Sequence, residues 1–219
     1  MNKNNSALIK RICGIGVFSA LAFVTTCVCK LIPNVAGFLS IDAKDAVIAI
    51  ASFIYGPLTA PIISLIVSFI EFISISTTGF WGLIMNFIGS SVFSLTASLI
   101  YKYRKSFNGA LIGFSIAVVL TTAAMVALIP IIVPLYSGAP REGVISMIPG
   151  VLLPFNFAKT LMNSALAMLL YKPMINALRS AGMIQRAEHK TAFNKTSVMT
   201  LIIGGVTLAL AFAVLIIIW

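Results

Sequence analysis

Charged residues are scarce in this sequence, and acidic residues are the scarcest. Only 9% of its 219 residues are charged, with 5 Asp and Glu against 15 Lys and Arg, whereas about a quarter of the residues in a soluble domain are charged. Hydrophobic residues make up 60% of the chain, and the mean hydropathy is +1.08. The composition therefore excludes an ordinary soluble domain and predicts a polytopic membrane protein.

Histidine, cysteine and catalytic motifs are also nearly absent. The only histidine, His189, lies in a polar stretch, and there is no G-x-x-x-x-G-K-[ST], H-E-x-x-H or G-x-S-x-G motif. Cys13, Cys27 and Cys29 all lie in the first apolar segment, so they indicate neither a disulfide framework nor a spaced metal site. We therefore expect no catalytic residue, no metal, no cofactor and no ATP hydrolysis by this chain.

The net charge of +10 raises the alternative of a nucleic-acid partner, but the basic residues stand in short clusters between apolar segments, as in membrane proteins. Placing the N-terminus in the cytoplasm puts eleven basic residues in cytoplasmic segments and three outside. The eleven are Lys3, Lys10, Arg11, Lys102, Arg104, Lys105, Lys172, Arg179, Arg186, Lys190 and Lys195; the three are Lys30, Lys44 and Arg141. This asymmetry predicts a cytoplasmic N-terminus, an external C-terminus and no nucleic acid.

Apolar segments predict seven helices in an all-α bundle, because no series of short segments alternates with the period of two that a membrane β-barrel requires. The predicted helices are 12–32, 43–55, 58–75, 80–100, 109–135, 148–178 and 197–218. Pro130 and Pro134 are expected to kink or end the fifth helix. The predicted domains are a six-helix membrane domain (1–178), a cytoplasmic linker (179–196) and an additional C-terminal transmembrane helix (197–219).

Small residues line part of the first helix. Gly16 and Ala20 form a small-xxx-small pair, which lets a second helix approach closely. Packing within this bundle and contact with another subunit both remain open for this pair.

Polar residues interrupt the last core segment. Asn156, Lys159, Thr160 and Asn163 follow i, i+3, i+4, i+7 spacing and share one helix face. An ammonium group in hydrocarbon costs several kcal/mol unless it faces protein or a cavity. Lys159 precedes the cytoplasmic Lys172 by thirteen residues, or about 20 Å of helix, which places it in the outer half of the membrane. This face is the best candidate for a binding site.

Other polar groups are predicted to converge on the same outer region. Glu71 and Asn86 lie near the outer ends of their helices, and Asp42 is expected to cap the short second helix, which leaves room for a cavity. The alternatives are structural roles. Lys159 would then form a buried ion pair with Glu71, and Asn86 and Asn163 would be interhelical hydrogen-bond partners.

Four stretches resemble a known family. They are 39–50 (LSIDAKDAVIAI), 53–58 (FIYGPL), 153–159 (LPFNFAK) and 170–173 (LYKP). They resemble the substrate-binding S components of bacterial energy-coupling-factor (ECF) vitamin transporters, and among them the riboflavin-specific subfamily most. The resemblance covers about residues 10 to 180 and leaves the last predicted helix outside it.

The resemblance implies a six-helix fold and a site for riboflavin, which would be transported rather than held as a cofactor. Asn156 and Lys159 would hydrogen-bond the flavin ring, and the first outer loop would cover the ligand. The full predicted set of substrate-binding residues is Asn156, Lys159, Asn163, Asn86, Glu71, Leu39, Ser40, Ile41 and Asp42. Gly16 and Ala20 would dock on a transmembrane coupling subunit, two separate ATPases would supply energy, and the S component would topple in the bilayer to release its vitamin.

One feature departs from the riboflavin-type pattern. Members usually carry an asparagine late in the fifth helix, and here 128–131 (LIPI) contains no amide. That contact would be lost or moved, for example to Asn86 or Asn163. This departure leaves the exact vitamin open but not the class of protein, so an S component for a different vitamin or precursor is one alternative. A membrane scaffold subunit that transports nothing, in which Lys159 and Glu71 pair structurally, is another.

Overall fold

The computed structural model describes residues 3–35, 37–182 and 195–218. Its elements, in chain order, are α1 (Lys3–Cys29), α2 (Lys44–Tyr55), α3 (Thr59–Ser74), α4 (Gly79–Tyr103), α5 (Phe107–Ser137), α6 (Arg141–Ser146), the π-helical turn η1 (Ile148–Leu152), α7 (Leu153–Ser180) and α8 (Lys195–Ile218). Each of the seven predicted helices is present, and all the regular elements of the described residues are helical. Most of the predicted linker, 183–194, lies outside the described residues.

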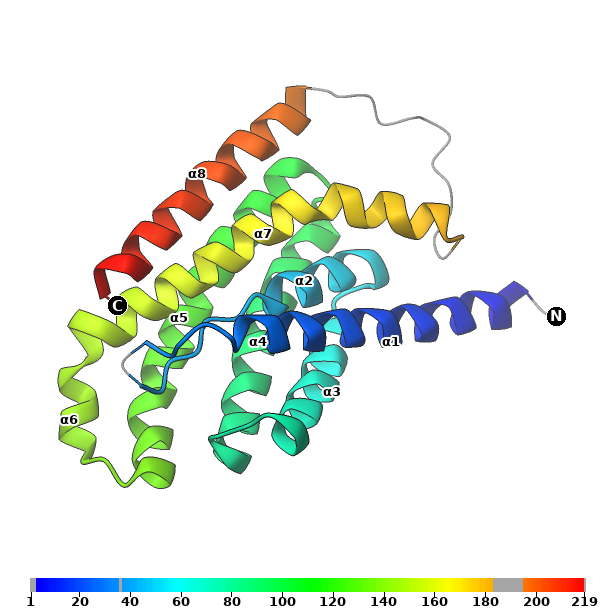
Figure 1. Ribbon diagram of the computed structural model, residues 1–219. Helices are drawn as coiled ribbons and strands as arrows, with labels where there is room; N and C mark the ends of the chain where they lie inside the picture. The colour runs from blue at the N-terminus through cyan, green and yellow to red at the C-terminus, as the bar shows by residue number, and fades with distance from the viewer. Residues whose placement is uncertain (1–2, 36, 183–194, 219) are drawn as a thin grey trace.

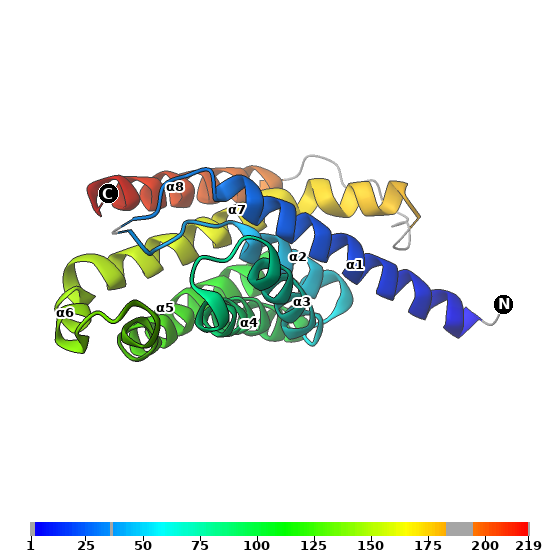
Figure 2. The ribbon, with the colours of Figure 1, turned by 60° about the horizontal axis from the view of Figure 1, so that its bottom comes forward.

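The helices form two layers with one short helix between them. Figure 2 shows α1, α7 and α8 on one side and α3, α4 and α5 on the other. α2 lies between the layers and contacts α1, α3, α4 and α7. Although α2 has only 12 residues, those from Lys44 to Ser52 are all buried. The N-terminal end of α2 is therefore held in the middle of the bundle, beside the cavity described below.

The helix ends differ from the predicted ones in two places. α5 continues through Pro130 and Pro134 to Ser137, because neighbouring helices can compensate for the backbone hydrogen bonds that proline removes within a membrane. The segment between the predicted fifth and sixth helices, 136–147, contains the short helix α6, and the chain enters α7 through the π-helical turn. Such turns change the direction of backbone carbonyl groups and often occur at functional sites.

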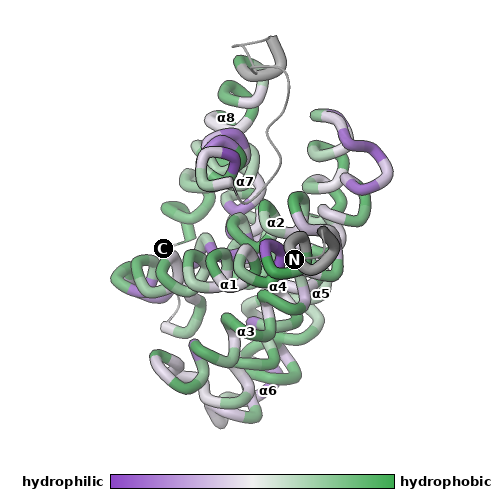
Figure 3. The backbone as a smooth tube through the Cα atoms, turned by 90° about the vertical axis from the view of Figure 1, so that its right-hand side faces the viewer, coloured by the Kyte–Doolittle hydropathy of each residue, from purple (hydrophilic) through white to green (hydrophobic). Residues whose placement is uncertain are grey.

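The apolar surface fits a bilayer. Four stretches of the described helices are long and apolar enough to cross a membrane: Leu8–Cys29, Gly79–Tyr103, Phe107–Ser137 and Val198–Ile218. α2 and α3 are too short by this criterion, with 12 and 16 residues, and α7 contains charged and amide side chains. Hydrophobic colour extends along the helices in Figure 3, and hydrophilic colour gathers in short stretches.

α8 packs against α7, and Figure 1 shows the two helices side by side. The contact is close at Gly204, where a Cβ atom would come within 2.9 Å of the Leu169 side chain. Further along α8, Ala211 and Leu215 are buried. α8 therefore covers one face of α7.

The small-residue pair of α1 does not pack within this bundle. Gly16 and Ala20 are both exposed, and a Cβ atom at position 16 would meet no other atom within 4 Å. The internal contact is made instead by Gly14, where a Cβ atom would overlap the Tyr55 ring. The face that carries Gly16 and Ala20 is thus available to another molecule.

Candidate functional site

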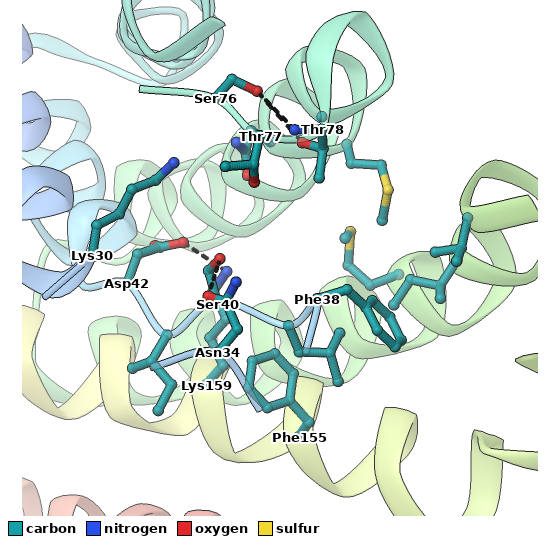
Figure 4. A pocket seen from close by; sticks show the side chains of 18 of the residues that line it. Lys30, Asn34, Phe38, Ser40, Asp42, Ser76, Thr77, Thr78, Phe155 and Lys159 are labelled. Atoms are coloured by element: carbon teal, nitrogen blue, oxygen red, sulfur yellow. Dashed lines mark hydrogen bonds and ion pairs between the residues drawn. The ribbon is translucent and has the colours of Figure 1, made fainter. Parts of the chain in front are cut away.

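A cavity of about 360 Å³ lies among the 30–42 loop, the α3–α4 turn, α4, α5 and the start of α7. Figure 4 shows side chains from these segments gathered around it. Its apolar lining comes from both layers and includes Phe38, Met85, Met125, Ile129, Val133 and Phe155. Its size is within the usual range for small-molecule pockets, about 300 to 1,000 Å³.

Lys159 forms an ion pair in the wall of this cavity with Asp42. Lys159 Nζ lies 2.7 Å from Asp42 Oδ2, and the two side chains are 20% and 6% exposed. The alternative in which Lys159 pairs with Glu71 is therefore not what the structure shows. The pair joins α7 to the residue that ends the 30–42 loop.

Asp42 does not cap α2 as predicted, because Ala43 holds the N-cap position and makes no side-chain cap. The carboxylate of Asp42 turns toward Lys159 instead. Burial alone would raise the pKa of this carboxyl, but the charges of Lys159 and Lys44 lower its pKa below the usual value. Asp42 is thus held as an anion within the wall.

The second oxygen of this carboxylate lies inside the wall rather than on its surface. Asp42 Oδ1 is fully buried, and the backbone N–H of Lys44 also helps to lower the pKa of the carboxyl. Asp42 lines the cavity, where it acts through its ion pair with Lys159.

Glu71 forms the second ion pair, with Lys44 of α2. Glu71 Oε1 lies 2.6 Å from Lys44 Nζ, and the side chains are 4% and 2% exposed. Glu71 Oε2 accepts a hydrogen bond of 2.8 Å from Asn86 Nδ2 of α4. Glu71 thereby fixes the amide group of Asn86, and Asn86 lines the cavity. No described residue donates a hydrogen bond to the Asn86 carbonyl oxygen.

Asn156 is held by the π-helical turn. Its Nδ2 donates a 2.7 Å hydrogen bond to the Leu152 carbonyl, the last in that turn. Asn156 also lines the cavity, and no described residue donates to its Oδ1. Asn86 and Asn156 therefore face the cavity with their amide groups already oriented by protein contacts.

The predicted face of α7 divides into two parts. Asn156 and Lys159 line the cavity, whereas Asn163 and Thr160 do not. Asn163 is fully buried: it donates to the Asp42 carbonyl at 2.9 Å and accepts from the Ala46 N–H at 2.9 Å. Because Asn163 lies one helical turn beyond Lys159, it contacts the start of α2 rather than the cavity.

The 30–42 loop closes one side of the cavity, where Leu39, Ser40 and Ile41 line it as predicted for a covering loop. Val35 and Leu39 exchange backbone hydrogen bonds of 2.9 and 3.0 Å, and Ser40 Oγ donates to Asn34 Oδ1 at 2.9 Å. The loop is therefore shaped by its own contacts.

Several lining residues were not found from the sequence. Lys30, Asn34 and Tyr136 line the cavity, as do the polar residues 76–78 of the α3–α4 turn. A run of serine and threonine is also typical of a solvated turn. Lys44, the partner of Glu71, could have been noticed in the sequence. Three of the four residues 42–45 are charged, which is unusual at the start of an apolar helix.

Comparison with known proteins gives the family. Residues 10–171 match the model for the ECF transporter, substrate-specific component. The chain belongs to this family. It is 30% identical over 184 residues to the riboflavin transporter RibU of Staphylococcus aureus (strain TCH60), covering 81% of this chain and 96% of that protein.

Two further relatives agree. The riboflavin transporter FmnP of Bacillus subtilis (strain 168) is 28% identical over 190 residues, covering 79% of this chain and 97% of that protein. A solved structure of the S component of a bacterial ECF transporter superposes with a TM-score of 0.67 at 30% identity, covering 78% of this chain and 99% of that one. The predicted family is thus confirmed, and this chain is a multi-pass membrane protein. α8 lies beyond the residues that match the family model.

Proposed function

We propose that this S component binds riboflavin in the cavity and delivers it inward together with an ECF module. The observation that carries the proposal is one cavity that combines aromatic and apolar walls with the oriented polar groups of Asn156, Lys159 and Asp42. A flat, mostly apolar ring with polar edges fits such a site. Riboflavin is the cargo rather than a cofactor, and the chain catalyses no reaction.

We assign the ring contacts as follows. Lys159 donates to a ring carbonyl, and Asn156 supplies its free carbonyl oxygen. The α5 wall has Met125, Ile129 and Val133 and offers no amide. Asn86, on the neighbouring helix α4, provides the amide on this side, because Glu71 already holds its NH₂ group.

Asp42 holds the ammonium of Lys159 in place through Oδ2. Its other oxygen, Oδ1, is buried inside the wall, so we assign Asp42 the role of orienting Lys159 toward the ligand. Asp42→Asn would keep the shape of this wall and weaken the contact with Lys159.

The test of the proposed function is binding to the purified full-length protein. Riboflavin fluorescence should be quenched with saturation at one equivalent, and Asn86→Leu should weaken binding about tenfold because a buried ligand atom loses its partner. Glu142→Gln, an exposed change in α6, is the control. Absence of quenching, together with binding of another vitamin in a competition panel, would assign a different cargo.

The orientation follows from the basic residues: the N-terminus is cytoplasmic, the C-terminus is outside, and the cavity opens outward. Figure 1 shows the two termini at opposite ends of the bundle, as this requires. Reporter fusions that are active on one side of the membrane only would measure it. A C-terminal fusion active in the cytoplasm would contradict the assignment.

The partners are a transmembrane coupling subunit and two ATPases, and the exposed Gly16 and Ala20 face of α1 is the docking surface. Gly16→Leu with Ala20→Leu should leave riboflavin binding within about twofold, since neither residue lines the cavity. Close helix packing needs small residues, so co-purification with a coexpressed ECF module should fall at least tenfold. Val28→Leu, an exposed change further along α1, is the control; equal co-purification of both variants would place the interface elsewhere.

A further inference from the structure

A second cavity, of about 380 Å³, lies at the opposite end of the bundle, between the first turns of α1, the α2–α3 turn and the end of α4. Three basic side chains line it: Arg11 from α1, and Lys102 and Lys105 from the end of α4 and the turn after it. None of its lining residues is acidic. The cavity therefore has the charge of an anion-binding site.

Basic residues at a membrane boundary also set topology without binding anything in particular. A role in topology alone does not explain why basic residues from separate helices line the same cavity. Arg11 and Lys102 are far apart in the sequence but line one concave surface, and Arg104, on the same turn, does not line it. A purely topological role requires charge near the boundary but no shared cavity.

A third cavity, of about 210 Å³, adjoins this one and is mostly apolar. It lies between α4, α5, α7 and α8, with Phe107, Phe114 and Met168 in its lining. Phe53, Tyr101 and Lys105 line both cavities. Phe53 and Tyr101 are stacked, with ring centroids 4.3 Å apart, so an aromatic wall borders both spaces. Lys105 reaches each of them, and Lys172 also lines the apolar cavity.

We propose that the two adjoining cavities bind one anionic phospholipid. Arg11, Lys102 and Lys105 hold its phosphate, and an acyl chain enters the apolar cavity beside Phe107 and Phe114. Arg and Lys bind phosphate oxygens strongly, and basic pockets between transmembrane helices are suited to lipid headgroups. An apolar cavity that shares a lysine with a basic one matches an amphipathic anion better than a free ion.

The experiment uses the full-length protein in detergent micelles. Binding of dioleoyl phosphatidylglycerol is measured by native mass spectrometry, with dioleoyl phosphatidylcholine, a dihexanoyl phosphatidylglycerol and inorganic phosphate as separate arms. Dioleoyl phosphatidylglycerol should bind at least tenfold more tightly than either other lipid. Inorganic phosphate that competes at equal concentration would show a soluble anion site and overturn the lipid assignment.

The variants test the residues. Lys102→Gln with Lys105→Gln should weaken phosphatidylglycerol binding at least tenfold, whereas Arg104→Gln with Arg141→Gln, which removes the same charge outside the cavities, should change it less than twofold. An equal loss of phosphatidylglycerol affinity in the two variants would show a general charge effect and contradict the proposal. Riboflavin binding, at the other end of the bundle, serves as the readout of folding for both.

Discussion

Lys159→Ala should weaken riboflavin binding at least tenfold in the purified protein. The substitution removes the one ammonium group that α7 brings to the cavity, 2.7 Å from Asp42. Hydrogen bonds that involve a charged group contribute about 1.5 to 3 kcal/mol, and 1.4 kcal/mol corresponds to a factor of ten in affinity. Fluorescence titration measures the change, and an unaltered affinity would show that Lys159 does not contact the ligand.

The same substitution should also destabilise the protein, so the two effects must be separated. Lys159→Ala leaves the buried carboxylate of Asp42 without its cation, and breaking a buried pair from one side costs about 3 to 5 kcal/mol. Lys159→Met combined with Asp42→Asn removes both charges and should recover most of the stability while binding stays weak. If binding returned together with stability, the role of Lys159 would be structural only.

Glu71→Gln should be among the most destabilising single changes in this chain. It leaves the ammonium of Lys44, of which only 2% is exposed, without its anion in the middle of the bundle. The expected loss is again about 3 to 5 kcal/mol, which lowers the midpoint of thermal unfolding by on the order of 10 °C for a chain of this length. Unfolding followed by circular dichroism in detergent measures it.

Two further variants test this explanation. Glu142→Gln changes an exposed acid and should shift the midpoint by less than about 2 °C, because exposed charges contribute little. Lys44→Met with Glu71→Met removes both members of the buried pair and should be more stable than Glu71→Gln alone. A double variant as unstable as the single one would mean that packing, rather than the unpaired charge, causes the loss.

Glu71→Gln should also weaken riboflavin binding, because Glu71 orients the side chain of Asn86. In the folded protein Glu71 accepts from the Asn86 amide, so Glu71→Gln lets that amide turn. We expect weaker riboflavin binding in the folded fraction, which is also expected if Glu71 itself touches the ligand. Asn86→Leu in the Glu71→Gln background distinguishes the two: if Glu71 acts only through Asn86, the second change should add little further loss.

The amino-acid sequence was sufficient to predict the class of the fold, the number of long helices and the family. Each of these depends on composition or on local periodicity: apolar segments of membrane length, a polar face at helical spacing on 156–163, and contiguous motifs. It also placed Asn156 and Lys159 together, because residues three apart share a helix face whatever surrounds them.

The pairing of the charges and the choice of amides that face the cavity depend on how the helices pack. Lys159 pairs with Asp42 and Glu71 with Lys44. This is because α2 is buried between the layers, which places Asp42 and Lys44, at its start, beside Lys159 and Glu71. Asn163 has the same chemistry and helix face as Asn156, but the backbone at 42–46 occupies its two hydrogen-bonding groups. Sequence spacing specifies the direction of a side chain, whereas the element that it meets depends on packing between segments more than a hundred residues apart.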